Sequence, residues 1–298
     1  MKKNNTKRVL SFDVGGTKIA SGIIEFKENS YQIYDYQKNA TPKNKDGVIQ
    51  KLIELIVYYQ RDNKFKKIGI GIAGQIDYKN EIIKHTPNIK GFDNVNLRKI
   101  IEETIGERVE IENDVKCFAL AENVFGRVRN YHNIVYLAIG TGIGGAIEID
   151  NKLYRGENNI AGEFGHMIIV SNGIKCACGN RGCWEQYVSG KAIEKLYFNL
   201  YGNKKGAKEI VSDSIKGTKK DKKVIKEASS YLAIGLINII NSVNPEVILI
   251  GGSVIKQDEI LKLAKKEVLK KVLIPGRKTK ILKSRLGNEA TLVGAGLL

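Results

Sequence analysis

The sequence lacks the features that mark membrane, secreted and modular proteins. No apolar stretch approaches the length of a membrane span. The apolar run after the basic start is too short for a signal peptide and meets a glycine turn at once. No linker or low-complexity segment interrupts the 298 residues, a length that suits one large domain or two modest ones. The sequence therefore predicts a soluble cytoplasmic protein with no membrane partner.

Acidic residues are scarce relative to basic ones. There are 32 Asp and Glu against 49 Lys and Arg, which gives a net charge of +17. Such a charge invites a nucleic-acid hypothesis. The lysines are spread along the chain, however, and the densest run, KGTKKDKKVIK at 216–226, has no aromatic residues interleaved to stack bases. We predict a lysine-rich solvated surface and no nucleic-acid partner. The positive field would attract an anionic substrate such as a nucleotide.

Strand and helix patterns alternate along the chain, which predicts an α/β fold. Short apolar runs bounded by glycine indicate strands, and apolar residues at a spacing of three or four indicate amphipathic helices. The predicted strands cover 7–13, 17–26, 31–37, 67–75, 109–112, 133–139, 145–149, 247–250 and 280–283. The predicted helices cover 46–61, 95–105, 114–125, 191–201, 221–242, 261–273 and 290–298.

Two segments repeat one theme, a glycine turn between two strands: DVGGTKIASGII at 13–24 and IGTGIGGAIEI at 139–149. The repeat suggests two related lobes that face a cleft. In the first turn, the N–H groups of Gly15 and Gly16 can converge on an anion, and Thr17 and Lys18 add a hydroxyl and a charge. Asp13 ends the strand, where a carboxylate can hold Mg²⁺ directly or through water. An ordinary hairpin turn is the alternative.

The second turn, Gly140–Gly145, matches G-x-G-x-x-G only loosely. A strand follows it, whereas a dinucleotide-binding fingerprint needs a helix, so the pattern argues against NAD. Donors at Thr141 and Gly142 suit the other side of a triphosphate. Elsewhere, Asn113 and Asp114 follow a short strand and open a helix. By position alone, helix capping is the usual role of such an aspartate.

One short segment, GEFGHMIIVSNGIKCACGNRGCWEQYVS at 162–189, concentrates most of the metal-binding residue types. Its H-x9-C-x-C-x4-C spacing suits tetrahedral zinc. A disulfide is disfavoured because two of the cysteines lie only two positions apart. Glycines at 173, 179 and 182 permit the tight turns of such a knot. The predicted ligands are His166, Cys176, Cys178 and Cys183, flanked by the carboxylates of Glu163 and Glu185. The remaining cysteine, Cys117, is predicted to be a buried thiol.

Together, these motifs resemble those of the ROK family of sugar kinases over essentially the whole chain. DVGGTK is similar to the family's first phosphate motif and IGTGIGGA to its second. GEFGH followed by CACGNRGCWEQYVSG resembles its zinc and sugar signature. ILIGGSV at 248–254 and LVGAGLL at the carboxyl end resemble its adenosine-side segments.

The resemblance implies an actin-like and hexokinase-like (RNase H-like) two-lobed ATPase fold with a central cleft. The small lobe would be residues 1–113, completed by a helix at 288–298. The large lobe would be residues 114–287, with the zinc-binding loop 162–189. The implied activity is ATP-dependent phosphorylation of a hexose at its 6-hydroxyl. Glucose is the first choice and N-acetylmannosamine or N-acetylglucosamine the alternative. The implied state is a homo-oligomer such as a dimer.

A sugar-responsive ROK regulator is a second class of function. Such regulators carry a helix-turn-helix segment ahead of the phosphate motif, and the motif begins here at Asp13. The sequence therefore favours the kinase.

The resemblance also assigns site residues. Asp114 would be the general base that accepts the proton of the sugar hydroxyl. The sugar would be held by Gly74, Asn88, Asn113, Asp114, Glu163, His166 and Glu185. ATP and Mg²⁺ would be held by Asp13, Gly15, Gly16, Thr17, Lys18, Thr141, Gly142, Gly251 and Gly252, and structural Zn²⁺ by His166 and the three cysteines. The chain departs from the family pattern at Lys116, where asparagine is usual, and at Ala73, where proline is usual.

Overall fold

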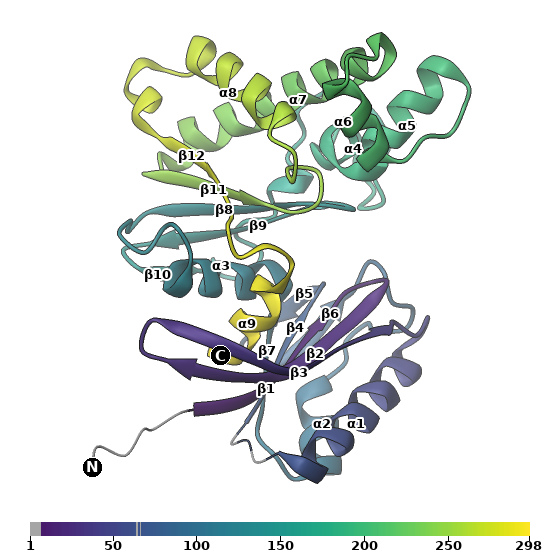
Figure 1. Cartoon of the computed structure of the whole chain (residues 1–298), viewed down its shortest axis with the longest axis vertical. Helices are drawn as coiled ribbons and strands as arrows, with labels where there is room; N and C mark the ends of the chain where they lie inside the picture. Colours follow the sequence, from purple (N-terminus) through teal and green to yellow (C-terminus); the bar gives the residue numbers. More distant parts are fainter. Residues whose placement is uncertain (1–6, 64, 66) are drawn as a thin grey trace. The chain divides into compact units, whose positions relative to one another are not determined.

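The computed structural model describes residues 7–63, 65 and 67–298, which divide into two compact units (Figure 1). Unit 1 comprises the described chain up to Arg129 together with Arg155–Ile160 and Arg285–Leu298. Unit 2 comprises Asn130–Tyr154 and Ala161–Ser284. Positions 1–6, on which the expected absence of a signal peptide partly rests, lie outside the described residues.

Unit 1 is built on a five-stranded sheet in the order β3-β2-β1-β4-β7. The strands β1 (Lys7–Val14), β2 (Lys18–Lys27) and β3 (Ser30–Ala40) pair antiparallel, and β4 (Ile68–Ile72) and β7 (Val109–Asn113) continue the sheet in parallel with β1. The helices are α1 (Lys45–Asp62), α2 (Leu97–Ile105), α3 (Asp114–Phe125) and α9 (Ala290–Leu297). A short hairpin, β5 (Gln75–Asp77) and β6 (Ile82–His85), follows β4.

The alternating sequence IGIGI of β4 determines what packs on each face of this sheet. Successive side chains of a strand point to opposite faces. The isoleucines of β4 join the buried cluster that contains Val48 and Leu52 of α1 and Ile101 of α2. On the other face, a Cβ at Gly69 would lie 1.9 Å from the carbonyl oxygen of Ala295 in α9. Glycine therefore allows α9 to approach the strand backbone directly.

The helices α3 and α9 also pack closely on each other. A Cβ at Gly294 would lie 1.7 Å from the carbonyl oxygen of Cys117 in α3. Cys117 itself is fully buried, as predicted, and burial raises the pKa of its thiol well above the usual value. This contact fixes α3, and with it Asp114, relative to the carboxyl-terminal helix.

Unit 2 repeats the sheet of unit 1. Its strand order is β10-β9-β8-β11-β12, again with two antiparallel pairs followed by two parallel pairs. The strands are β8 (Ile134–Ile139), β9 (Ile143–Ile149), β10 (Lys152–Tyr154), β11 (Val247–Gly251) and β12 (Lys280–Lys283). The turn β1–β2 thus corresponds to the turn β8–β9, which confirms the repeat seen in the sequence.

Unit 2 contains the segment 162–189 with the four predicted zinc ligands, here called the zinc-type segment. The α-helices of this unit are α4 (Glu185–Val188), which ends that segment, α5 (Gly190–Tyr201), α6 (Ala207–Ile215), α7 (Lys219–Val243) and α8 (Glu259–Lys271). Trp184 is fully buried and packs on α7, where a Cβ at Gly235 would lie 2.1 Å from the indole ring. Its Nε1 donates to the carbonyl oxygen of Tyr231 at 2.8 Å. This single tryptophan anchors the segment that contains Cys183 and Glu185.

The predicted strands and helices are present, with ends shifted by a few residues. The predicted strand 67–75 is shorter in the structure, where β4 ends at Ile72 and Gln75 begins the separate strand β5. The hairpin β5–β6, strand β10 and helices α4 and α6 were not predicted. The division into units differs from the predicted boundary at 113/114, because α3 belongs to unit 1. Among the described residues, no helix has the length and apolar character needed to cross a membrane.

Candidate active site

The first glycine turn joins β1 to β2 in unit 1. The N–H of Gly15 donates to the carbonyl oxygen of Lys18 at 3.0 Å, and Thr41 Oγ1 donates to the carbonyl oxygen of Gly15 at 2.7 Å. A Cβ at Gly16 would lie 2.4 Å from the Cβ of Asn88. Glycine at this position therefore leaves the space in which Asn88 lies against the turn. The structure brings together a predicted ATP-binding residue and a predicted sugar-binding residue.

Asp13 and Asp114 influence each other electrostatically. The pKa of Asp13 is raised to about 7, chiefly by burial and secondly by the negative charge of Asp114, while the positive charge of Lys18 opposes the shift. Asp114 is the first residue of α3, and its Oδ1 accepts a hydrogen bond from the N–H of Val115 at 2.9 Å. Two carboxylates that repel each other in a partly buried site favour a bound cation between or beside them. The donor set at Asp13 therefore fits Mg²⁺, which prefers oxygen ligands.

Asn113, and not Asp114, caps α3. Its Oδ1 accepts hydrogen bonds from the N–H groups of Val115 at 2.9 Å and Lys116 at 3.2 Å. The capping role leaves Asp114 in the first turn of the helix, where the positive end of the dipole stabilises its negative charge. Asn113 also donates through Nδ2 to the carbonyl oxygen of Gly74 at 3.1 Å. The cap of α3 is thus bonded to the predicted sugar-contacting turn.

The second glycine turn, in unit 2, is bonded to a glutamate of the zinc-type segment. The N–H of Ile143 donates to Oε2 of Glu185 at 2.9 Å. A Cβ at Gly142 would lie 2.2 Å from the same oxygen. The N–H of Gly190, at the start of α5, donates to the carbonyl oxygen of Gly140 at 2.8 Å. The turn is therefore held by the segment that follows the cysteines.

Gly251 and Gly252 lie next to this turn. Gly251 ends β11, paired with Ala138 of β8. Gly252 has a φ of 101°, and a Cβ there would lie 2.3 Å from the carbonyl oxygen of Ile139. Only glycine suits that backbone conformation at so close an approach. The predicted adenosine-side segment and second phosphate turn are neighbours in unit 2.

The GEFGH segment packs directly on β9. A Cβ at Gly162 would lie 2.6 Å from the carbonyl oxygen of Gly145, and one at Gly165 would lie 2.2 Å from the carbonyl oxygen of Ile143. Glycine at these two positions lets the segment lie directly on β9, the strand that follows the second phosphate turn. Glu163 lies between these two glycines, and His166 directly follows Gly165. Glu163 precedes, and His166 ends, a short 3₁₀ helix, η1 (Phe164–His166).

The four predicted zinc ligands converge. One donor atom from each of His166, Cys176, Cys178 and Cys183 lies within 4.8 Å of the other three. The Sγ atoms of Cys178 and Cys183 are 3.6 Å apart, and His166 Nδ1 is 3.8 Å from Sγ of Cys176. A tetrahedral zinc ion with bonds of about 2.3 Å to sulfur requires donor separations of about 3.8 Å. The cluster therefore fits zinc, with His166 using Nδ1.

The surrounding residues support the metal centre. The amide N–H of Asn180 lowers the pKa of the Cys178 thiol through a hydrogen bond, which favours the thiolate that a metal needs. Gln186 Nε2 donates to Sγ of Cys176 at 3.6 Å. Gly179 and Gly182 have positive φ values of 96° and 84°, as expected for tight turns.

Gly173 is needed for another reason than its backbone conformation. A Cβ there would lie 2.0 Å from the hydroxyl oxygen of Tyr187. That hydroxyl accepts a hydrogen bond from the N–H of Ile174 at 2.9 Å. Tyr187 was not predicted to take part, because nothing in its position in the sequence marks it.

The predicted site residues are divided between the two units. Unit 1 contains Asp13, Gly15, Gly16, Thr17, Lys18, Gly74, Asn88, Asn113 and Asp114. Unit 2 contains Thr141, Gly142, Glu163, His166, Cys176, Cys178, Cys183, Glu185, Gly251 and Gly252. In each unit, one glycine predicted to bind phosphate packs on a residue predicted to bind sugar: Gly16 on Asn88 in unit 1 and Gly142 on Glu185 in unit 2.

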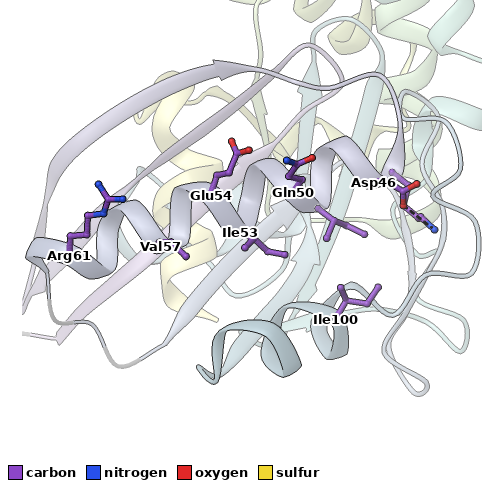
Figure 2. A pocket seen from close by; sticks show the side chains of 9 residues that line it. Asp46, Gln50, Ile53, Glu54, Val57, Arg61 and Ile100 are labelled. Atoms are coloured by element: carbon purple, nitrogen blue, oxygen red, sulfur yellow. Dashed lines mark ion pairs between the residues drawn. The ribbon is translucent and has the colours of Figure 1, made fainter.

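A separate groove of ≈ 750 Å³ lies between α1 and α2 of unit 1 (Figure 2). Its apolar wall is formed by Ile49, Ile53, Val57 and Ile100, and charged side chains such as Glu54 and Arg61 border it. None of the residues predicted to bind sugar, ATP or metal lines it. The groove is therefore distinct from the candidate active site.

The comparison with protein families decides the family. Residues 9–298 match the model of the ROK family. The chain belongs to the ROK family. It is 32% identical to an N-acetyl-D-glucosamine kinase of Vibrio cholerae, over 96% of this chain and 98% of the relative. It is 36% identical to a xylose repressor of Bacillus spizizenii, over 96% of this chain and 75% of the repressor.

The fold of this ROK chain also matches solved ROK structures. One is a ROK family glucokinase from Streptomyces griseus in complex with glucose and AMPPNP, with a TM-score of 0.83 and 29% identity over 97% of this chain and 98% of that one. The predictions of the ROK family and of the actin-like, two-lobed sugar kinase fold are thereby confirmed.

Proposed function

We propose that this ROK protein is an ATP-dependent sugar kinase that transfers the γ-phosphate of ATP to the 6-hydroxyl of a hexose, with glucose as the first candidate. The match to kinase relatives over nearly the whole chain supports the reaction class. The observation that carries the proposal is the position of Asp114 in the first turn of α3, close enough to Asp13 to influence its pKa.

Asp114 acts as the general base in the proposed reaction. Its carboxylate accepts the proton of the 6-hydroxyl as that oxygen bonds to the γ-phosphorus. The bond between the γ-phosphorus and the bridging oxygen of ADP breaks with its electron pair, so ADP leaves. Asn113 holds the carboxylate in place by capping the helix and by its bond to Gly74.

The two glycine turns hold the phosphates in this proposal. Gly15, Gly16, Thr17 and Lys18 supply donors and a positive charge from unit 1, and Thr141 and Gly142 supply donors from unit 2. Gly251 and Gly252 let the adenosine approach the backbone. Bound Mg²⁺, held by Asp13, would supply charge neutralisation of the phosphates.

The sugar is held by polar groups from both units in this proposal. Gly74, Asn88 and Asn113 contribute from unit 1, and Glu163, His166 and Glu185 from unit 2. His166 faces the thiol of Cys176 with Nδ1, which leaves Nε2 for a sugar hydroxyl in this proposal. Zinc at His166 and the three cysteines would supply structural support alone, since four protein ligands complete a tetrahedral site.

A coupled ADP-release assay tests the function. Zinc-replete protein is offered Mg-ATP with glucose, mannose, fructose, N-acetylglucosamine and N-acetylmannosamine. A far higher kcat/KM for glucose supports the proposal as stated. Preference for an N-acetylhexosamine moves the substrate to the class named for the Vibrio cholerae relative. No turnover with any of these sugars contradicts the kinase assignment.

A sugar-binding regulator is the second candidate, and the xylose repressor relative favours it. A regulator of this kind would bind a sugar without phosphorylating it. Calorimetric sugar binding without ADP release, together with a gel shift at physiological salt, would support the regulator. Rapid turnover without a gel shift would exclude it.

A further inference from the structure

We propose that Lys116 is a positioning residue that holds the sugar-contacting turn at residues 73–77 against the amino end of α3. The inference rests on the proposed sugar-kinase function, in which that turn contacts the substrate. It links Lys116 to the turn that begins at Ala73 through contacts that all lie within unit 1.

Lys116 points inward from α3, since only 3% of its surface is exposed. Its Nζ donates to the carbonyl oxygen of Asn159 at 2.8 Å and also to the side-chain Oδ1 of Asn159. A buried ammonium group is costly unless such acceptors surround it, so these bonds fix the direction of the side chain. The lysine is therefore directed at one residue of the segment Arg155–Ile160.

Asn159 links Lys116 to the turn by a further hydrogen bond. Its Nδ2 donates to the carbonyl oxygen of Ile76 at 2.8 Å, and its own φ is 60°. Asparagine tolerates this left-handed conformation better than most residues, so the backbone and the amide side chain suit the same position. Ile76 lies in β5, two residues after Gly74. The hydrogen bonds from Lys116 to Asn159 and from Asn159 to Ile76 thus reach the same turn to which Asn113 donates at Gly74.

A second contact holds the other end of the segment. Arg155 donates to Oε2 of the fully buried Glu112 through Nε at 3.1 Å and Nη2 at 2.8 Å. Its guanidinium lies 4.4 Å from the ring centroid of Tyr78. Arg155 and Asn159 therefore both connect the end of β7 and the start of α3 to the residues that follow Gly74.

Ala73 itself places little restriction on the backbone of the turn. Proline restricts a turn by fixing φ, and alanine leaves that freedom to the chain. The hydrogen bonds through Asn159 restrict the same turn from outside. A correctly held turn binds the sugar equally in the ground state and the transition state, so its loss raises KM more than it lowers kcat.

Three variants test the role of Lys116. Lys116→Met keeps an unbranched side chain of the same length as the lysine stem up to Cε and removes the ammonium group. Asn159→Gly keeps the left-handed backbone and removes the amide. Lys205→Met is the matched control, because Lys205 in unit 2 donates to the fully buried Asp221 at 2.8 Å and lies outside the proposed site.

Lys116→Met is expected to raise the KM for the sugar about tenfold, the scale of a lost charge-assisted interaction with Asn159, with kcat nearly unchanged. Asn159→Gly is expected to act in the same direction, and the double variant to be no worse than Lys116→Met alone. Amide hydrogen exchange at residues 73–78 should accelerate in both. Lys205→Met should lower Tm without changing KM or that exchange.

A purely structural Lys116 would give another result: a lower Tm, as for Lys205→Met, with unchanged sugar KM and unchanged exchange at residues 73–78. That outcome would overturn the proposal. If the wild-type protein phosphorylates no sugar, the proposed function fails. The exchange comparison then still decides whether Lys116 holds the turn.

Discussion

Oε2 of Glu185 accepts a hydrogen bond from the amide N–H of Ile143 at 2.9 Å. The glutamate follows the last cysteine of the metal cluster by two residues, and the amide follows Gly142 of the second phosphate turn. One side chain therefore connects the loop of the candidate zinc site to the loop proposed to bind ATP. A change at either loop should affect the binding of both substrates.

Gly142→Ala tests this connection. The new Cβ would lie 2.2 Å from Oε2 of Glu185, so the carboxylate must move and its bond to Ile143 is lost. We expect the KM values for both ATP and sugar to rise by about tenfold, which corresponds to the loss of one charged hydrogen bond. Steady-state kinetics with each substrate varied in turn gives both values.

Gly206→Ala is the control for that experiment, because no heavy atom lies within 4 Å of a Cβ at Gly206. It should leave both KM values unchanged. A rise in the KM for ATP alone in Gly142→Ala would mean that Glu185 has no part in sugar binding.

Removal of the metal should be visible in the fluorescence of Trp184. This only tryptophan of the chain is fully buried and directly follows Cys183. Chelation should release the segment from α7, shift the emission to longer wavelength and lower Tm, because metal binding to such a site contributes to folding. Re-addition of zinc should restore the emission and the sugar affinity together.

Two cysteine variants separate the metal from general stability. Cys178 is exposed, so Cys178→Ser removes a ligand without opening a core cavity, and it should lower the zinc content from about one ion per chain to nearly none. Cys117 lies outside the cluster, and Cys117→Ala should keep the metal. Equal zinc content in wild type and Cys178→Ser would contradict the assigned ligand set.

Asp114→Asn tests the proposed base. Asparagine keeps the shape of the side chain and cannot accept the hydroxyl proton, so kcat should fall by about 10²–10⁴-fold. Sugar affinity, measured by calorimetry, should change little because the capping residue Asn113 is untouched. A variant that keeps a large share of wild-type kcat would show that another group accepts the proton.

The sequence predicted the local patterns well, and the structure supplied what connects them. The fold and the converging metal ligands followed from motifs that are compact in sequence, such as the cluster from Cys176 to Cys183. The bond between Glu185 and Ile143 spans 42 positions and had no local signal. The hydrogen bond from Lys116 to Asn159 could not be predicted for the same reason, since the two residues lie 43 positions apart.

The missed helix α6 and hairpin β5–β6 have a different cause. Each is short, at nine residues for α6 and three and four residues for the two strands. Segments of this length take their structure from tertiary contacts more than from their own periodicity. For β5, those contacts include the bond from Asn159 to Ile76.

The raised pKa of Asp13 predicts a pH dependence of stability in the absence of ligands. The folded protein binds this proton with a pKa of about 7, against an ordinary value of 3.8, chiefly because the carboxyl group is buried. Folding therefore favours the protonated form. The resulting stabilisation is fully present below pH 4, decreases as the pH rises towards 7, and is absent at pH 8.

Asp13→Asn removes this titration. At pH 8 the variant should be more stable than the wild type by on the order of 4 kcal/mol, or several degrees in Tm, and the difference should shrink towards pH 4. Differential scanning fluorimetry of metal-free protein across this range measures it.

Asp46→Asn is the control, because the Asp46 side chain is 86% exposed. Mg²⁺ at pH 8 should stabilise the wild type more than Asp13→Asn, since only the wild type offers it the carboxylate. A pH-independent difference between the wild type and Asp13→Asn would mean that Asp13 does not titrate in this range.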